Sequence, residues 1–83
     1  MVINVLWSQI NNSGSIRMHE AAYAHAEQIA PALRAAVEVN PKTRVLIRAD
    51  KNVRYEYLRQ VMKAAGDAGV GNVTFSVVNR EEQ

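Results

Sequence analysis

Residues 43–78, TRVLIRADKNVRYEYLRQVMKAAGDAGVGNVTFSVV, decide the fold of this chain. A β-branched and apolar run at 43–49 predicts a strand, apolar residues at helical spacing over 55–68 predict a helix, and alternating apolar and polar residues over 72–78 predict a second strand. A strand that returns parallel to its predecessor through one helix crosses over right-handed. This unit therefore predicts the middle of a small α/β sandwich.

The beginning of the chain predicts a β-hairpin. Residues 2–9 (VINVLWSQ) are a strand candidate whose odd-numbered side chains share one face. The turn-forming sequence Asn11-Asn12-Ser13-Gly14 follows, and residues 15–18 supply a short second strand. We expect Trp7, the only tryptophan, to pack in the core or at an edge rather than to stack on a ligand.

Residues 19–40 favour a helix, but Pro31 lies inside this segment. A helix that starts near Glu27 places the proline in the first turns, where its missing N–H costs little, and leaves residues 21–26 as at most an extra turn. The alternative is a kinked helix from about Ala21. We prefer the first, which ends at Asn40-Pro41 because a residue before proline leaves the α region. Its predicted buried stripe is Ile29, Leu33, Ala36 and Val37.

The second helix also has a predicted buried face and a clear end. Its apolar residues recur at i, i+3, i+4 and i+7 and are expected to pack on the sheet. Gly69 then ends the helix in the left-handed conformation, with Val70 as the apolar contact of the cap. The residues of the predicted buried face are Leu58, Val61, Met62 and Ala65.

The last strand is predicted to have one buried and one exposed side. Its apolar residues point to the buried side, and Thr74 and Ser76 point to the other. An edge position would leave backbone groups of this strand open to pairing. The residues expected on the buried side are Val73, Phe75 and Val77.

Together these elements predict a two-layer sandwich of the α+β or α/β class. The expected order is ββαβαβ, with two helices packed on one face of a mixed sheet in a single domain over residues 1–83. Residues 79–83 are expected to be a flexible polar tail.

The composition excludes several classes of protein. Without cysteine the chain has neither disulfides nor a thiolate metal site. Its net charge of +2 is small and its basic residues are dispersed among acidic ones, which is unlike a nucleic-acid-binding surface. No apolar run approaches the roughly 18 residues that a membrane span needs. We expect a soluble domain with no cofactor and no nucleic-acid partner.

Two groups of polar residues invite a chemical role. His19, Glu20 and His25 are potential zinc ligands, but six residues separate the histidines, so the sequence predicts solvated helix-surface residues instead. Asp50 follows a strand, at the end of the sheet where α/β folds place ligands. Without a nucleophile, a paired acid or a phosphate loop beside it, Asp50 is expected to form the turn and to cap the next helix.

The order and spacing of residues 45–78 resemble the ExbD/TolR family of biopolymer transport proteins. The shared features are an apolar strand ending in Arg48-Ala49-Asp50-Lys51, then Val53 and Tyr55, a helix with Val61-Met62, and Ala68-Gly69-Val70 before a valine-rich strand. The similarity extends more loosely to the turn near Gly14 and to the helix that ends before Pro41.

The resemblance implies the periplasmic domain of a single-pass inner-membrane protein. Such subunits work with an ExbB/TolQ-like channel, and they couple the proton-motive force to a TonB- or TolA-like protein in transport or envelope maintenance. This sequence lacks the family's membrane helix and its aspartate, so we expect a periplasmic domain separated from its anchor. Arg54 stands where many members have proline or an acidic residue.

We therefore expect a non-enzymatic module that forms a homodimer and recruits a partner segment to an exposed sheet edge; peptidoglycan is a further partner that TolR-like members suggest. The alternatives are a stand-alone α/β module that binds peptide, peptidoglycan or RNA, and a small enzyme with Asp50 as its reactive group. The residues predicted for the partner or dimer surface are Asp50, Arg54, Tyr55, Val73, Thr74, Phe75, Ser76, Val77 and Val78.

Overall fold

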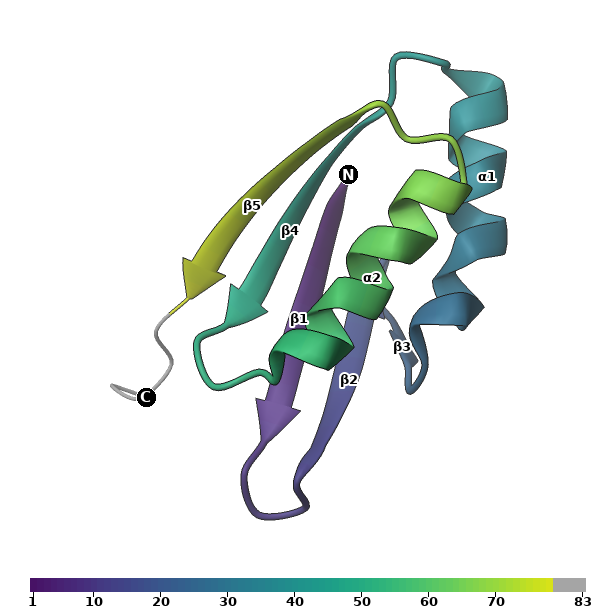
Figure 1. Cartoon of the computed structure of the whole chain (residues 1–83). Coiled ribbons are helices and arrows are strands. Elements are labelled where there is room, and N and C mark those ends of the chain that lie inside the picture. Colours follow the sequence, from purple (N-terminus) through teal and green to yellow (C-terminus); the bar gives the residue numbers. More distant parts are fainter. Residues whose placement is uncertain (79–83) are drawn as a thin grey trace.

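A computed structural model describes residues 1–78 and shows a mixed sheet with two helices (Figure 1). The sheet has five strands in the order β3-β2-β1-β4-β5. β1 pairs antiparallel with β2 and parallel with β4, and β5 pairs parallel with β4. The strands are β1 (Val2–Ser8), β2 (Ser13–Met18), β3 (Ala21–Tyr23), β4 (Arg44–Asp50) and β5 (Asn72–Val78), and the helices are the 3₁₀ turn η1 (Ala26–Ile29), α1 (Ala30–Val39) and α2 (Tyr55–Asp67).

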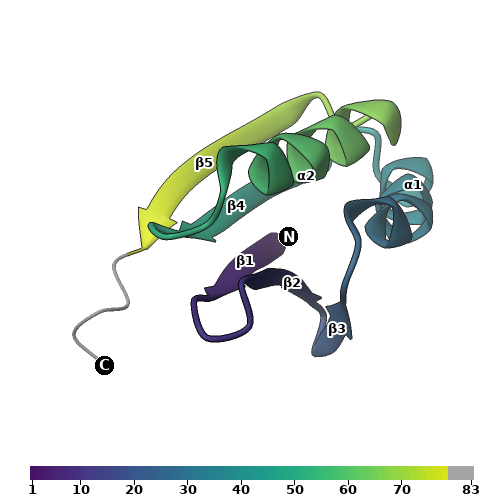
Figure 2. The same cartoon turned by 60° about the horizontal axis from the view of Figure 1, so that its bottom comes forward.

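Within residues 1–78, the helices cover one face of the sheet and leave the other without cover. Alternate residues of the inner strands are buried and join the helix residues Ile29, Leu33 and Val61 in one hydrophobic cluster. We call this side the helix-covered face and the other side the open face. α1 and α2 contact each other, and η1 also contacts α2 (Figure 2). The strand residues buried on the helix-covered face are Ile3, Val5, Ile16, Met18, Val45, Ile47 and Ala49.

The first helix begins as the Pro31 argument predicts. η1 starts near Glu27, and α1 follows with Pro31 in its first turn, where a missing N–H leaves no intrahelical bond unmade. Asn40 is the C-cap, and its N–H donates to Ala36 O over 2.9 Å. In the predicted stripe, Ile29 and Leu33 are fully buried, whereas Ala36 and Val37 are half-buried.

The segment before this helix differs from both alternatives in the sequence prediction. Ala21–Tyr23 is a third strand, neither an extra helical turn nor the start of a kinked helix. It pairs antiparallel with β2 through a turn formed by His19 and Glu20, whose φ angles of 55° and 68° lie in the left-handed region. These two residues are therefore turn residues, and their prediction as helix-surface residues was wrong.

The second helix confirms most of its predicted stripe and corrects one position. Leu58, Val61 and Ala65 are buried, but Met62 is 45% exposed and Ala64 is buried in its place. The helix ends in a Schellman motif: Gly69, at a φ of 91°, donates to Gly66 O over 3.0 Å, and Val70 donates to Ala65 O over 3.1 Å. Val70 is itself buried, as the cap predicted.

A contact between Trp7 and Tyr57 fixes the hairpin to α2. The two rings meet edge to face with centroids 6.1 Å apart, and the Arg54 guanidinium lies 5.6 Å from the centroid of the Trp7 ring. The Tyr57 hydroxyl donates to Ala24 O over 2.9 Å. Trp7 is thus a packing residue, as predicted. Gly14 leaves room for the ring, because a Cβ there would lie 2.6 Å from Tyr57 Cε2.

We predict that Gly14→Ala destabilises the domain. The Tyr57 ring cannot move aside without losing its hydroxyl bond and its contact with Trp7, so the added methyl group should cost about 1–3 kcal/mol, as overpacking generally does. Urea unfolding measures this change. The control is Gly66→Ala, since that Cβ meets nothing within 4 Å and lies in a helix. The control should gain about 0.5–1 kcal/mol, and equal effects of both variants would contradict the role of Gly14.

The alkaline stability of the domain should depend on Tyr57. Desolvation raises the pKa of its hydroxyl above the ordinary value of 10.0. Because the folded state then holds this proton more tightly than the unfolded state, the resulting stability is fully present below pH 10.0 and is lost as the pH rises through the raised pKa. Ultraviolet titration should show one late tyrosine transition that Tyr57→Phe removes. The same variant should lose less stability than the parent above pH 10.0.

Candidate functional site

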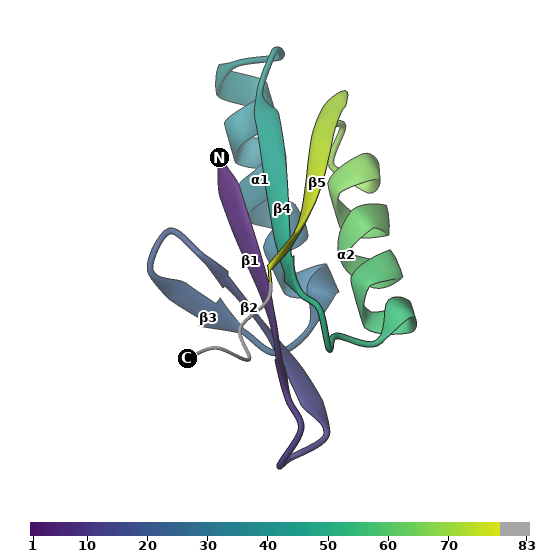
Figure 3. The same ribbon diagram turned by 90° about the vertical axis from the view of Figure 1, so that its left-hand side faces the viewer.

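The strand β5 forms one edge of the sheet and, within residues 1–78, lacks the charges and the proline that commonly protect an edge. It spans seven residues, NVTFSVV, and has no charged residue and no proline. Only β4 pairs with it among residues 1–78, so the backbone groups on its other side are open to pairing. The opposite edge, β3, has only three residues. Figure 3 views the molecule from the β5 side.

The apolar side chains of β5 are exposed, which corrects the sequence prediction. Val73, Phe75 and Val77 pair in register with Val45, Ile47 and Ala49, so they point to the helix-covered side as predicted. They are nevertheless 40%, 40% and 62% exposed. The expectation that these residues, Phe75 included, are buried was wrong, because the helices cover the inner strands and not the edge.

One flank of α2 extends this apolar surface. Gln60, Ala64 and Asp67 line a groove against α1 and η1, so the opposite flank of α2 is the one on the β5 side. That flank carries Tyr55 and Met62, seven residues apart on the same helical stripe and 72% and 45% exposed. We call the five residues Tyr55, Met62, Val73, Phe75 and Val77 the edge patch. Aromatic residues and Met are enriched at protein interfaces, so the edge patch is a candidate interaction surface.

Asp50 is a turn-former at the carboxyl end of β4, where it is the register partner of Val78 at the end of β5. It is only 7% exposed, and its carboxylate accepts the Asn52 N–H over 3.0 Å. The turn is joined to β5 by the Lys51 N–H, which donates to Val78 O over 2.9 Å. Asp50 does not cap α2, because the N-cap position is Arg54 and no side chain bonds there. The turn-forming half of the prediction for Asp50 is thus confirmed, and the capping half was wrong.

The predicted site residues do not all come together. Asp50 and Val78 are register partners, and Tyr55 begins the helix that follows this turn. Arg54 instead points toward the hairpin, where its guanidinium donates to Asn12 Oδ1 over 3.1 Å. Thr74 and Ser76 lie on the open face. Met62 was missed as a surface residue, since its hydrophobicity suggested burial.

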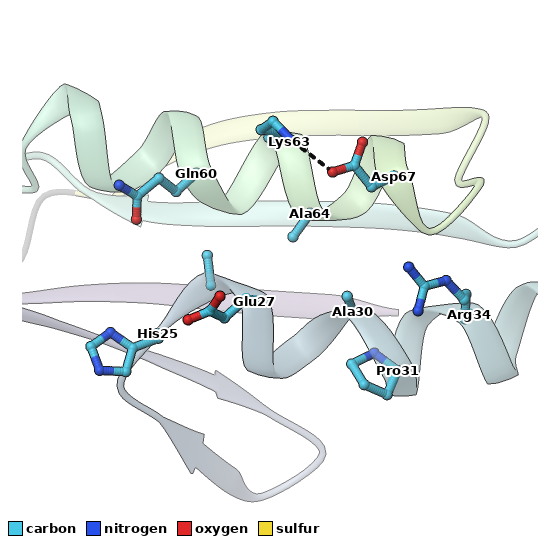
Figure 4. A pocket seen from close by; sticks show the side chains of 10 residues that line it. His25, Glu27, Ala30, Pro31, Arg34, Gln60, Lys63, Ala64 and Asp67 are labelled. Carbon is cyan, nitrogen blue, oxygen red and sulfur yellow. Dashed lines mark hydrogen bonds and ion pairs between the residues drawn. The ribbon is translucent and has the colours of Figure 1, made fainter.

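The groove between the two helices offers no reaction chemistry (Figure 4). It has a volume of about 610 Å³ and an alanine-rich floor formed by Ala26, Ala30 and Ala64. His25 and Glu27 lie toward one end and Arg34 and Asp67 toward the other, and Lys63 pairs with Asp67 over 2.9 Å. Acids and bases balance along the groove, and no nucleophile with an adjacent base is found there.

Within residues 1–78, no cluster of three or more His, Cys, Asp or Glu side chains is arranged to hold a metal ion. None of the helices in that range has the length and apolar character that crossing a bilayer requires. The one buried ionisable residue among them, Asp50, is explained by its turn.

Comparison with known proteins gives one clear result. The family model for the biopolymer transport protein ExbD/TolR matches residues 3–80, which is nearly the whole chain. Among curated proteins no significantly similar sequence was found. Apart from Val2, the first residue of β1, the family match covers the helices and strands described above. The chain therefore belongs to the ExbD/TolR family of biopolymer transport proteins.

Proposed function

We propose that this chain is the periplasmic coupling domain of an energy-transducing subunit. ExbD/TolR proteins serve biopolymer transport and are anchored in the inner membrane. In this proposal the domain performs no catalysis, works beside an ExbB/TolQ-like channel, and transmits work to a TonB- or TolA-like protein. The observation that carries it is the unprotected, apolar edge at β5, since coupling by contact needs a surface that pairs.

A second copy is the first occupant that this edge fits. Two β5 strands related by a two-fold axis perpendicular to the sheet run antiparallel, so each strand can pair with the other and join two five-stranded sheets. The edge patches then meet on the helix-covered side of the joined sheet. No charge from β5 opposes such pairing, because the strand has none.

An extended segment of the partner protein is the second occupant. Every second side chain of a strand added at β5 would lie beside Val73, Phe75 and Val77. The remaining side chains would lie on the open face, beside Thr74 and Ser76. The proposal therefore requires a partner segment that alternates apolar and polar residues. Main-chain bonds would provide affinity, and the edge patch would select the apolar side chains.

We predict that Val77→Lys weakens self-association. The substitution places a positive charge on each of two facing edges, and like charges at an interface oppose pairing strongly, so the dimer dissociation constant should rise about tenfold or more. Sedimentation equilibrium measures it. The control is Val39→Lys, which adds the same charge at an 87% exposed valine of α1 and should leave the constant unchanged. A domain that stays monomeric at all concentrations, or equal effects of both variants, would contradict the proposed dimer.

Amide exchange separates the partner segment from the second copy. A peptide that alternates apolar and polar residues should slow the exchange of β5 amides in the unmodified chain at concentrations below the dimer dissociation constant, and Phe75→Ser should weaken that protection about tenfold by removing an aromatic anchor. A scrambled peptide of the same composition is the control. Unprotected β5 amides at saturating concentrations of the alternating peptide would contradict recruitment at this edge.

A further inference from the structure

The strands of the sheet carry three positively charged side chains on the open face. Arg17 of β2, Arg44 of β4 and Arg48 of β4 all point to this face and are exposed. None of the three side chains forms a hydrogen bond or ion pair with another residue of the part that the structure describes. The only acidic strand residue is Asp50, which is buried at the end of β4 and bonded within its turn.

The arrangement of these arginines is a planar array. Asn4 is the register partner of both Arg17 and Arg48, so β1 separates the two arginines by about 10 Å, two inter-strand spacings. Arg44 lies four residues before Arg48 on the same strand, about 13 Å away. The three side chains thus mark the corners of a triangle, and a row of Arg17, Asn4, Arg48 and Ser76 crosses four strands.

The residues between the arginines are polar or aliphatic and lie on an uncovered surface. Val2 is exposed, and Leu6 and Leu46 are half-buried beside the row of polar residues. A hollow of about 500 Å³ at the β2–β3 end is lined by Asn4 and Arg17 and by the turn residues His19 and Glu20, so one carboxylate lies at this end of the face. Three exposed guanidinium groups on such a face are complementary to an anionic surface, and guanidinium matches phosphate geometry with two parallel bonds.

We propose that the open face docks on an anionic phospholipid surface, with Arg17, Arg44 and Arg48 contacting separate headgroup phosphates. A planar array of cations fits a planar array of phosphates better than an extended acidic peptide, which would meet the arginines along one line only. A second copy is disfavoured, because the same three positive charges would face themselves. Single-stranded RNA lacks a stacking platform here, since Trp7, Tyr23 and Phe75 all lie on the helix-covered side.

Vesicle cosedimentation of the 83-residue chain tests this docking. We expect binding to vesicles that contain phosphatidylglycerol, little binding to phosphatidylcholine alone, and weaker binding as salt is added. Each basic residue at an anionic surface contributes a factor of about five to partitioning, so the triple variant Arg17→Gln, Arg44→Gln, Arg48→Gln should bind about a hundredfold more weakly. The three side chains are exposed, and circular dichroism should show an unchanged fold.

The matched control removes the same net charge elsewhere. Arg34→Gln, Lys42→Gln and Arg59→Gln replace exposed cations of the helices and of the loop before β4. If the open face docks, this control should keep most of the binding. Equal losses in both triple variants would show that net charge alone acts, and no preference for phosphatidylglycerol would overturn the docking. Polyglutamate that displaces the chain from vesicles at the same charge concentration would favour an acidic peptide instead and also overturn the proposal.

Discussion

The structure depends on one constraint: two short helices cannot cover a five-stranded sheet. α1 has 10 residues and α2 has 13, and their apolar faces bury only alternate residues of the inner strands. Much of the surface outside this cover stays exposed, which includes the side chains of β5 on the helix-covered side and the arginines of the open face. A small domain buries a smaller fraction of its surface than a large one. In this chain the uncovered surface includes both candidate interaction sites.

The Trp7–Tyr57 contact is the second support of the fold. β1 and β2 project beyond the helices at the hairpin end (Figure 1), and the tip is fixed to α2 by an aromatic pair, a cation–π contact and a side-chain hydrogen bond from Arg54 to Asn12. The Tyr57 hydroxyl adds a bond to the segment between β3 and η1. The first turn of α2 therefore holds two segments that are distant from it in sequence, the hairpin and the segment at Ala24.

Periodicity predicted the elements well and the exposure of single residues less well. The strand, helix and strand over 43–78 match β4, α2 and β5 because each has a strong local pattern. Met62 was assigned to the core because it lies four residues after Leu58 in the apolar pattern, yet the rotation of the helix buries Ala64 instead. Phe75 points to the helix-covered side as predicted but is 40% exposed, since the alternation of a strand does not indicate how far a helix extends over it. β3 was missed because its turn uses His19 and Glu20 in a left-handed conformation that such residues seldom adopt.

The parallel arrangement of β1, β4 and β5 has a mechanical consequence. The chain enters the sheet at the start of β1, and both β4 and β5 run in the same direction as β1. If the N-terminus and a strand bound at β5 were pulled in opposite directions, the force would act along the strands. It would strain the rows of inter-strand hydrogen bonds together, in shear, instead of opening them one at a time from an end. In this orientation the sheet would transmit a pull along its strands as shear between neighbouring strands.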